Sequence, residues 1–229
     1  MTSKIKYILL ALLLVIISLA ILVTGWSIMS NIFFPKHGSW IGNLQLYQWT
    51  AIGIIAFYIS KRFLKENLRW FETFTHELTH TLIAILFFRR IHSFEAKNDN
   101  GLIMSSGNDK TLVFVDLAPY CLPIYTYILL AFRSICYSTF LWCIDIIIGV
   151  SIAFHISTIK NQIGNYQTDI NKRPLYFSYT YITAALLFNL CVVIVSYWST
   201  KNVFTAIWYV CKDIWSHRNY SGRFAVLIL

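Results

Sequence analysis

Long uninterrupted apolar runs constrain this chain more than any other feature of its sequence. The first extends from Ile5 to Met29, directly beside two lysines, and is too long for the core of a cleaved signal peptide. A bilayer offers backbone groups no hydrogen bonds, so a run of this length folds as a helix there. Hydrophobic residues make up 57% of the chain and charged residues 13%, with a mean hydropathy of +0.60. We therefore predict an integral, multi-pass membrane protein of the cell membrane.

The apolar runs predict an all-α fold with about six transmembrane helices in one transmembrane domain over residues 1–229. No repeat and no Gly-, Pro- or Ser-rich linker divides the chain. The predicted helices cover Ile5–Met29, Leu44–Ser60, the segment from Trp70 to Phe88, Leu112–Phe132, Tyr137–Phe154 and Tyr176–Trp198. A further short or interfacial helix is expected over Val203–Trp215.

The formal net charge of +9 does not indicate a nucleic-acid partner. The basic residues stand in short loops beside apolar runs, as between Lys61 and Arg69, and not on a stripe interleaved with aromatic residues. Anionic lipid headgroups are the simpler partner for such loops. The five cysteines lack CxxC spacing and are expected to be small buried hydrophobes. We expect membrane lipids as partners and no nucleic acid.

The motif His76-Glu77-Leu78-Thr79-His80 lies inside the predicted helix that begins near Trp70. Histidines four residues apart project from one helix face with β-carbons about 5–6 Å apart, close enough to bind one metal ion. The glutamate between them is placed to take a proton from water at the open position of that metal. The alternative is a pair of core histidines hydrogen-bonded to helix neighbours. We favour the metal because ionisable groups in a membrane are costly and usually functional.

A catalytic zinc ion usually has three protein ligands, so a third must come from elsewhere in the chain. Asp169 is favoured because its segment is polar, and His155 is the next candidate. Asp116 and Asp145 are single carboxylates in apolar helices, and each is expected to hydrogen-bond a neighbouring helix. Two further roles are predicted near the metal. Asn161 or His155 stabilises the oxyanion or supports the ligands, and Glu72 is an exposed partner of Arg69 or, alternatively, orients His76.

The pattern changes between Arg89 and Lys110, where two short stretches, Ile91–Ala96 and Leu102–Ser105, flank the turn-forming sequence Asn98-Asp99-Asn100-Gly101. This predicts a small β-hairpin at the membrane surface near the histidine motif. It either holds an extended substrate by strand addition or simply connects two helices. The next predicted span contains Pro119 and Pro123, which free backbone carbonyls and kink a helix.

Several of these motifs together resemble the site-2-protease-like intramembrane zinc metalloproteases, the M50 peptidases. His76 to His80 is similar to their metal motif, and Leu117-Ala118-Pro119 to the Ala-Gly-Pro segment that opens their next helix. Asn161 and Asp169 stand eight apart, as in the family's segment that ends at the ligand aspartate, although Ile170 replaces the usual glycine. The resemblance implies zinc-dependent cleavage of peptide bonds in or near the membrane, in transmembrane or membrane-proximal proteins.

The sequence therefore predicts a zinc metalloprotease in which His76, His80 and Asp169 hold the ion and Glu77 is the general base. On this hypothesis residues 1–69 form N-terminal helices and a basic loop, 70–175 the catalytic core, and 176–229 the C-terminal helices. The alternative, from another class, is a non-catalytic transport or structural membrane protein with a structural histidine or metal cluster.

Overall fold

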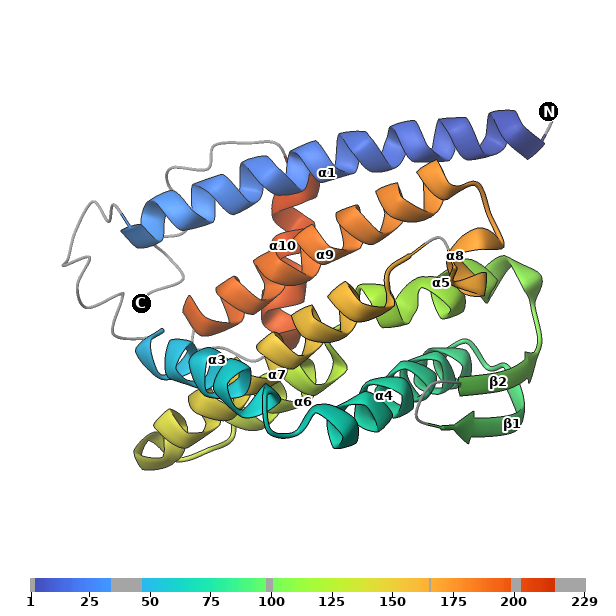
Figure 1. The fold of residues 1–229 in the computed structure, drawn as a ribbon. Coiled ribbons are helices and arrows are strands. Elements are labelled where there is room, and N and C mark those ends of the chain that lie inside the picture. The colour runs from blue at the N-terminus through green and yellow to red at the C-terminus, as the bar shows by residue number, and fades with distance from the viewer. Residues whose placement is uncertain (1–2, 34–46, 98–100, 165, 199–202, 217–229) are drawn as a thin grey trace.

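A computed structural model describes residues 3–33, 47–97, 101–164, 166–198 and 203–216 as a helical protein with one small sheet (Figure 1). The helices are α1 (Ser3–Phe33), α3 (Gln48–Lys61), α4 (Lys65–Leu86), α5 (Leu112–Leu117), α6 (Ile124–Arg133), α7 (Leu141–Gln162), α8 (Thr168–Asn171), α9 (Leu175–Trp198) and α10 (Val203–Ser216), and the strands are β1 (Arg90–Ala96) and β2 (Gly101–Ser106). The predicted helical fold with a single hairpin is confirmed for this part of the chain.

Three described helical segments are long and apolar enough to cross a membrane: Lys4–Trp26, Ser138–Gln162 and Leu175–Ser196. A bent pair made of α5 and α6 adds a fourth if it counts as one span. Helices α3 and α10 have 14 residues each, about 21 Å at 1.5 Å per residue, against a hydrocarbon core of about 30 Å. The structure thus supports three or four spans, and the predicted six are not confirmed.

The predicted span Leu112–Phe132 is bent at its prolines, as predicted, and the bend is so sharp that the segment forms two helices. Helix α5 ends in a 3₁₀ turn over Ala118–Tyr120, α6 begins at Ile124, and their axes differ by 79°. Pro119 and Pro123 lie at the break, where neither can donate the backbone hydrogen bond that would continue the helix. The prolines therefore end one helix and allow the next to start in a new direction.

Helix α7 is longer than the sequence indicated. The predicted helix ends at Phe154, but the observed helix continues to Gln162 and ends only where Ile163 turns extended, just before Gly164. No glycine or proline interrupts the eight residues after Phe154, so polarity alone does not stop the helix. As a result α7 carries a polar end that reaches beyond its apolar part and lies beside α4 (Figure 1).

Close packing of small residues joins the helices of the apolar part. Helix α1 runs alongside α9, and α3 packs along α7 (Figure 1). A β-carbon added to Gly53 would lie 2.0 Å from the Ile146 carbonyl oxygen, and one added to Gly149 would lie 2.0 Å from that of Thr50. The two glycines let the backbones of α3 and α7 touch, as small residues do between membrane helices.

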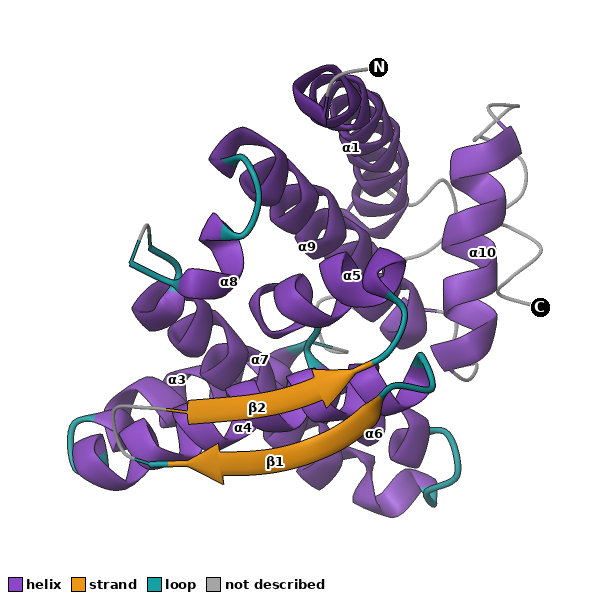
Figure 2. Cartoon of the chain, turned by 90° about the vertical axis from the view of Figure 1, so that its right-hand side faces the viewer, coloured by secondary structure: helices purple, strands orange, loops and turns teal. Residues whose placement is uncertain are grey.

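The hairpin lies across α4, as Figure 2 shows. Strands β1 and β2 pair antiparallel from Arg90 opposite Ser106 to Ala96 opposite Gly101. The ring of Phe94 packs edge-on against Phe74 of α4, with centroids 5.9 Å apart. The predicted hairpin is confirmed, and its Gly101 end is brought beside the histidine helix.

Candidate metal centre

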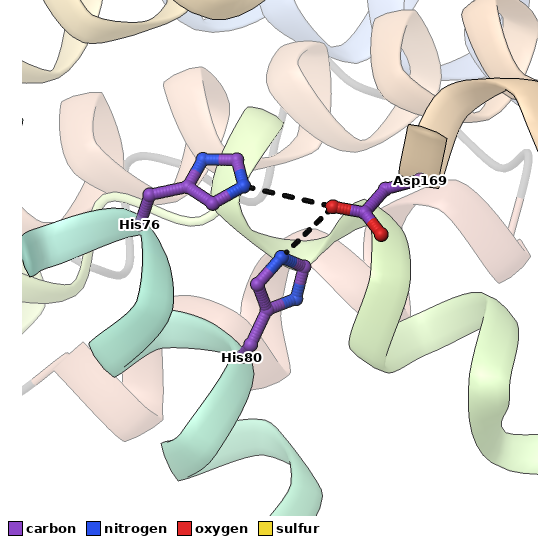
Figure 3. Close-up of side chains that lie close together, drawn as sticks. All are labelled: His76, His80 and Asp169. Atoms are coloured by element: carbon purple, nitrogen blue, oxygen red, sulfur yellow. Dashed lines mark hydrogen bonds and ion pairs between the residues drawn. The ribbon is translucent and has the colours of Figure 1, made fainter. Parts of the chain in front are cut away.

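Two elements bring three potential metal ligands together. His76 and His80 are one turn apart on α4, and both are buried. Asp169 lies on α8, a helix of four residues that follows α7 in the chain. The Oδ2 atom of Asp169 lies 3.7 Å from Nε2 of His76 and 3.2 Å from Nε2 of His80 (Figure 3). Within the described ranges this is the one group of three or more His, Cys, Asp or Glu side chains whose ligand atoms all lie within 4.8 Å of one another.

Hydrogen bonds to the other ring nitrogens orient both histidines. His80 Nδ1 lies 2.7 Å from the backbone oxygen of Val115, and His76 Nδ1 lies 2.7 Å from Oε1 of Gln162. Since a carbonyl oxygen can only accept, each Nδ1 carries a proton, and in the neutral imidazole each Nε2 then presents a lone pair. This is the arrangement that metal-binding histidines adopt.

With the rings in this orientation, three hydrogen-bond acceptors meet: Nε2 of His76, Nε2 of His80 and Oδ2 of Asp169. Two imidazole lone pairs face one carboxylate oxygen, and such groups repel one another unless a cation lies among them. Burial raises the pKa of Asp169, but the charge of Lys172, whose Nζ lies 2.9 Å from Oδ1, lowers the pKa and favours the ionised carboxylate. The carboxylate is therefore ionised at neutral pH. A donor set of two nitrogens and one carboxylate oxygen suits a zinc ion with one position left open.

Glu77, predicted as the general base, is buried on the same turn of α4 and meets the hairpin. A β-carbon added to Gly101 would lie 2.2 Å from Oε1 of Glu77, so the first residue of β2 leaves room for the carboxylate only because it has no side chain. The hairpin thus forms one wall of the site.

A cleft of about 720 Å³ opens beside two of the three ligands, His76 and Asp169. Its lining is mostly polar and includes Lys61, Arg69, Glu72, Thr73, His76, Glu77, Asn161, Gln162, Gln167, Thr168 and Asp169. The polar ends of α3, α4 and α7 and the segment that leads into α8 supply these side chains. A hydrated peptide backbone fits this environment better than an intact apolar helix does.

Asn161, predicted to stabilise the oxyanion or support the ligands, lines the cleft but hydrogen-bonds Glu72. Its Nδ2 atom donates to both carboxylate oxygens of Glu72, at 3.0 and 2.9 Å, and Ser157 donates to Oε1 at 3.1 Å. Glu72 is 6% exposed, so the prediction of an exposed glutamate is wrong. This error has the same physical origin as the prediction that the helix ends at Phe154. Helix α7 continues past Phe154, and its added residues cover Glu72.

His155, the other candidate for oxyanion or supporting roles, is not brought to the ligand group. Its ring hydrogen-bonds the backbone of Cys121, and its Nε2 is buried without a partner in the described part of the chain. Asp116 and Asp145 behave as predicted for carboxylates that tie segments together. Asp145 pairs with Arg133 of α6 at 2.7 Å, and Asp116 pairs with Lys172 and Arg173.

Two residues of the site were not predicted from the sequence. Gln162 orients His76, and the ring of Tyr120 packs edge-on against the same imidazole with centroids 5.2 Å apart. Gln162 had a weak signal, because it stands seven residues before Asp169 in the same polar stretch. Tyr120 had none beyond its place after Pro119.

The comparisons with known proteins give one finding. A sequence model of the family described as Peptidase M50B-like matches residues 49–165, more than half of the chain. The match contains His76, Glu77 and His80 and ends four residues before Asp169. Neither the curated proteins nor the solved structures contain a match to the chain.

Proposed function

This chain belongs to the peptidase M50B-like family, and from this premise we propose that it is an intramembrane zinc metalloprotease. The substrates are membrane-embedded or membrane-proximal proteins, and hydrolysis of a peptide bond divides each of them into two fragments. The observation that carries the proposal is the convergence of Nε2 of His76, Nε2 of His80 and Oδ2 of Asp169, three ligand atoms within 4.8 Å of one another that can hold a metal ion. Family membership supports the protease class, and the apolar helices support a membrane location.

Each residue of the site has a role in this reaction. His76, His80 and Asp169 hold the zinc ion, which when bound supplies Lewis acidity for attack of water on a carbonyl carbon. Glu77 takes the proton of the attacking water and passes it to the leaving amine nitrogen. Gln162 and the Val115 carbonyl keep the two imidazoles turned toward the ion.

The site also favours a particular state of the substrate. A peptide bond inside a helix is already hydrogen-bonded and shielded, so a membrane substrate must unwind before it is cut. The polar cleft offers an unwound segment side chains to bind, and the outer edge of the hairpin offers it backbone groups for strand addition. We therefore propose cleavage where a membrane segment meets a polar flank.

The test uses purified chain reconstituted with a panel of membrane-anchored reporter proteins that differ in the sequence around the membrane boundary. The wild type should contain about one zinc per chain and cleave at least one reporter. Glu77→Gln keeps the size of the side chain but removes its basicity, so this variant should retain zinc and cleave none.

The other outcomes separate the alternatives. A wild-type chain free of zinc after purification and zinc addition would contradict the metal centre. Zinc bound at His76 and His80 with cleavage unaffected by Glu77→Gln would contradict the mechanism. Zinc bound with no reporter cleaved would favour the non-catalytic role with a structural metal.

A further inference from the structure

The second carboxylate oxygen of Asp169 is held by a lysine. Lys172, three residues later at the end of α8, donates from Nζ to Oδ1 of Asp169 at 2.9 Å. Oδ2 of the same carboxylate faces the two histidine nitrogens. The two oxygens of one side chain are thus divided between the lysine and the metal centre.

Lys172 is itself anchored from a different part of the chain. Its Nζ atom also donates to Oδ1 of Asp116 at 2.9 Å, while Arg173 donates to Oδ2 of Asp116 at 2.8 Å. Asp116 is 4% exposed and belongs to α5, the first half of the broken span. The buried aspartate therefore binds two consecutive cations and fixes the end of α8 against α5.

We propose that Lys172, held by Asp116, is a positioning residue that limits Asp169 to a single oxygen toward the metal. The inference rests on the proposed function, because it assumes that His76, His80 and Asp169 bind zinc. A carboxylate can bind a metal through one or both oxygens. With Oδ1 engaged by an ammonium group, only Oδ2 is available, and the coordination position needed by water stays open.

The charges of this network agree with the role. Asp116 and Asp169 carry two negative charges, and Lys172 and Arg173 carry two positive ones, so the network is neutral before any metal binds. Lys172 is about half exposed, so its removal costs little packing. Its influence on the carboxylate is therefore open to test without loss of the fold.

The experiment replaces zinc with cobalt(II), whose visible absorption is stronger in four-coordinate than in five-coordinate sites, and measures the affinity for each metal. In the wild type we expect the strong absorption of a four-coordinate site. Lys172→Met releases Oδ1, so the absorption should weaken as Asp169 binds through both oxygens. The zinc affinity should fall about 10- to 100-fold, the usual effect of removing a group that orients a ligand.

Three variants control the measurement. Lys172→Arg keeps a cationic donor and should restore most of the wild-type spectrum. Lys160→Met removes an exposed lysine near the end of α7 and should change nothing. Asp116→Asn leaves Lys172 in place but weakens its anchor, so it should give the same spectral change to a smaller degree, and it provides the test if Lys172→Met does not fold.

Failure of this inference differs from failure of the proposed function. A wild-type chain that binds neither cobalt nor zinc would overturn both. A wild-type four-coordinate spectrum that is unchanged in Lys172→Met and in Asp116→Asn would overturn the positioning role alone and leave the metal centre intact.

Discussion

Two carboxylates, the buried Asp145 and the partly buried Asp169, show how similar residues become structural in one place and chemical in another. Asp145 on α7 has both oxygens on the Arg133 guanidinium, at 2.7 and 3.4 Å. Asp169 on α8 has one oxygen on a lysine and turns the other toward two imidazole lone pairs. The first pair is electrostatically closed, because a cation and an anion satisfy each other. The second leaves an excess of acceptors that a metal ion would neutralise.

This difference separates candidates that composition could not. Asp116, Asp145 and Asp169 were all possible third ligands, and each is at least partly buried. Within the described part of the chain, what distinguishes Asp169 is that no lysine or arginine pairs with its Oδ2, whereas Nε2 atoms of two histidines face this oxygen. The chemistry of a buried acid thus depends on which partner each oxygen has, more than on burial.

The largest expected effect comes from replacing Asp169, the carboxylate that faces the two histidines. Asp169→Ala removes a ligand, so zinc binding should fail and cleavage should drop about 10³-fold or more, since metal activation is worth several kcal/mol. Asp145→Asn should leave about one zinc per chain. Metal analysis of the two purified variants checks the contrast. Loss of zinc from Asp145→Asn with retention in Asp169→Ala would reverse the assignment.

The local parts of this site could be predicted from the sequence, and the rest could not. The spacing of His76 and His80 fixes their common helix face, and the turn chemistry around Gly101 predicts a hairpin, because both depend on neighbours in the chain. Gln162 meets His76 across a separation of 86 residues, a contact that depends on where α7 ends and how it packs. The predicted number of spans is not confirmed for a related reason. Apolar content does not reveal how sharply one run bends at Pro119 and Pro123 or that α3 has only 14 residues.

The ion pair of Arg133 and Asp145 should affect the stability of the fold more than zinc binding or cleavage. Arg133→Met leaves Asp145 buried without its guanidinium, which costs about 3–5 kcal/mol of unfolding free energy for a buried charge that loses its partner. Thermal unfolding in detergent measures the change, and the double variant Arg133→Met with Asp145→Leu should recover most of it. Zinc content should not change while the protein is folded. A double variant no more stable than Arg133→Met would show that the pair acts through other contacts.

The hairpin wall provides a test of geometry without any change of charge. Gly101→Ala puts a methyl group into the position of the Glu77 carboxylate, which is the end of a flexible side chain and moves at little cost in stability. Displacing the base by about 1 Å should lower cleavage about 10²-fold while zinc content and unfolding temperature stay near wild type. The control is the zinc affinity of Gly101→Ala, which should equal that of the wild type because Gly101 acts only through the Glu77 carboxylate. A lower zinc affinity in Gly101→Ala would assign Gly101 a separate role.

The smallest expected effect concerns the orientation of one ligand. Gln162→Ala removes the acceptor for His76 Nδ1 while the Val115 carbonyl still orients His80, so zinc affinity should fall about 10- to 100-fold without being lost. Competition with a chelator of known affinity measures the change. Gln167→Ala is the matched control, because Gln167 lies in the same cleft outside the ligand group and its loss should leave zinc affinity unchanged. Equal zinc affinities for Gln162→Ala and wild type would mean that the packing of α4 alone holds the His76 ring in place. The metal centre would then depend less on single hydrogen bonds than the Arg133–Asp145 pair depends on its ion pair.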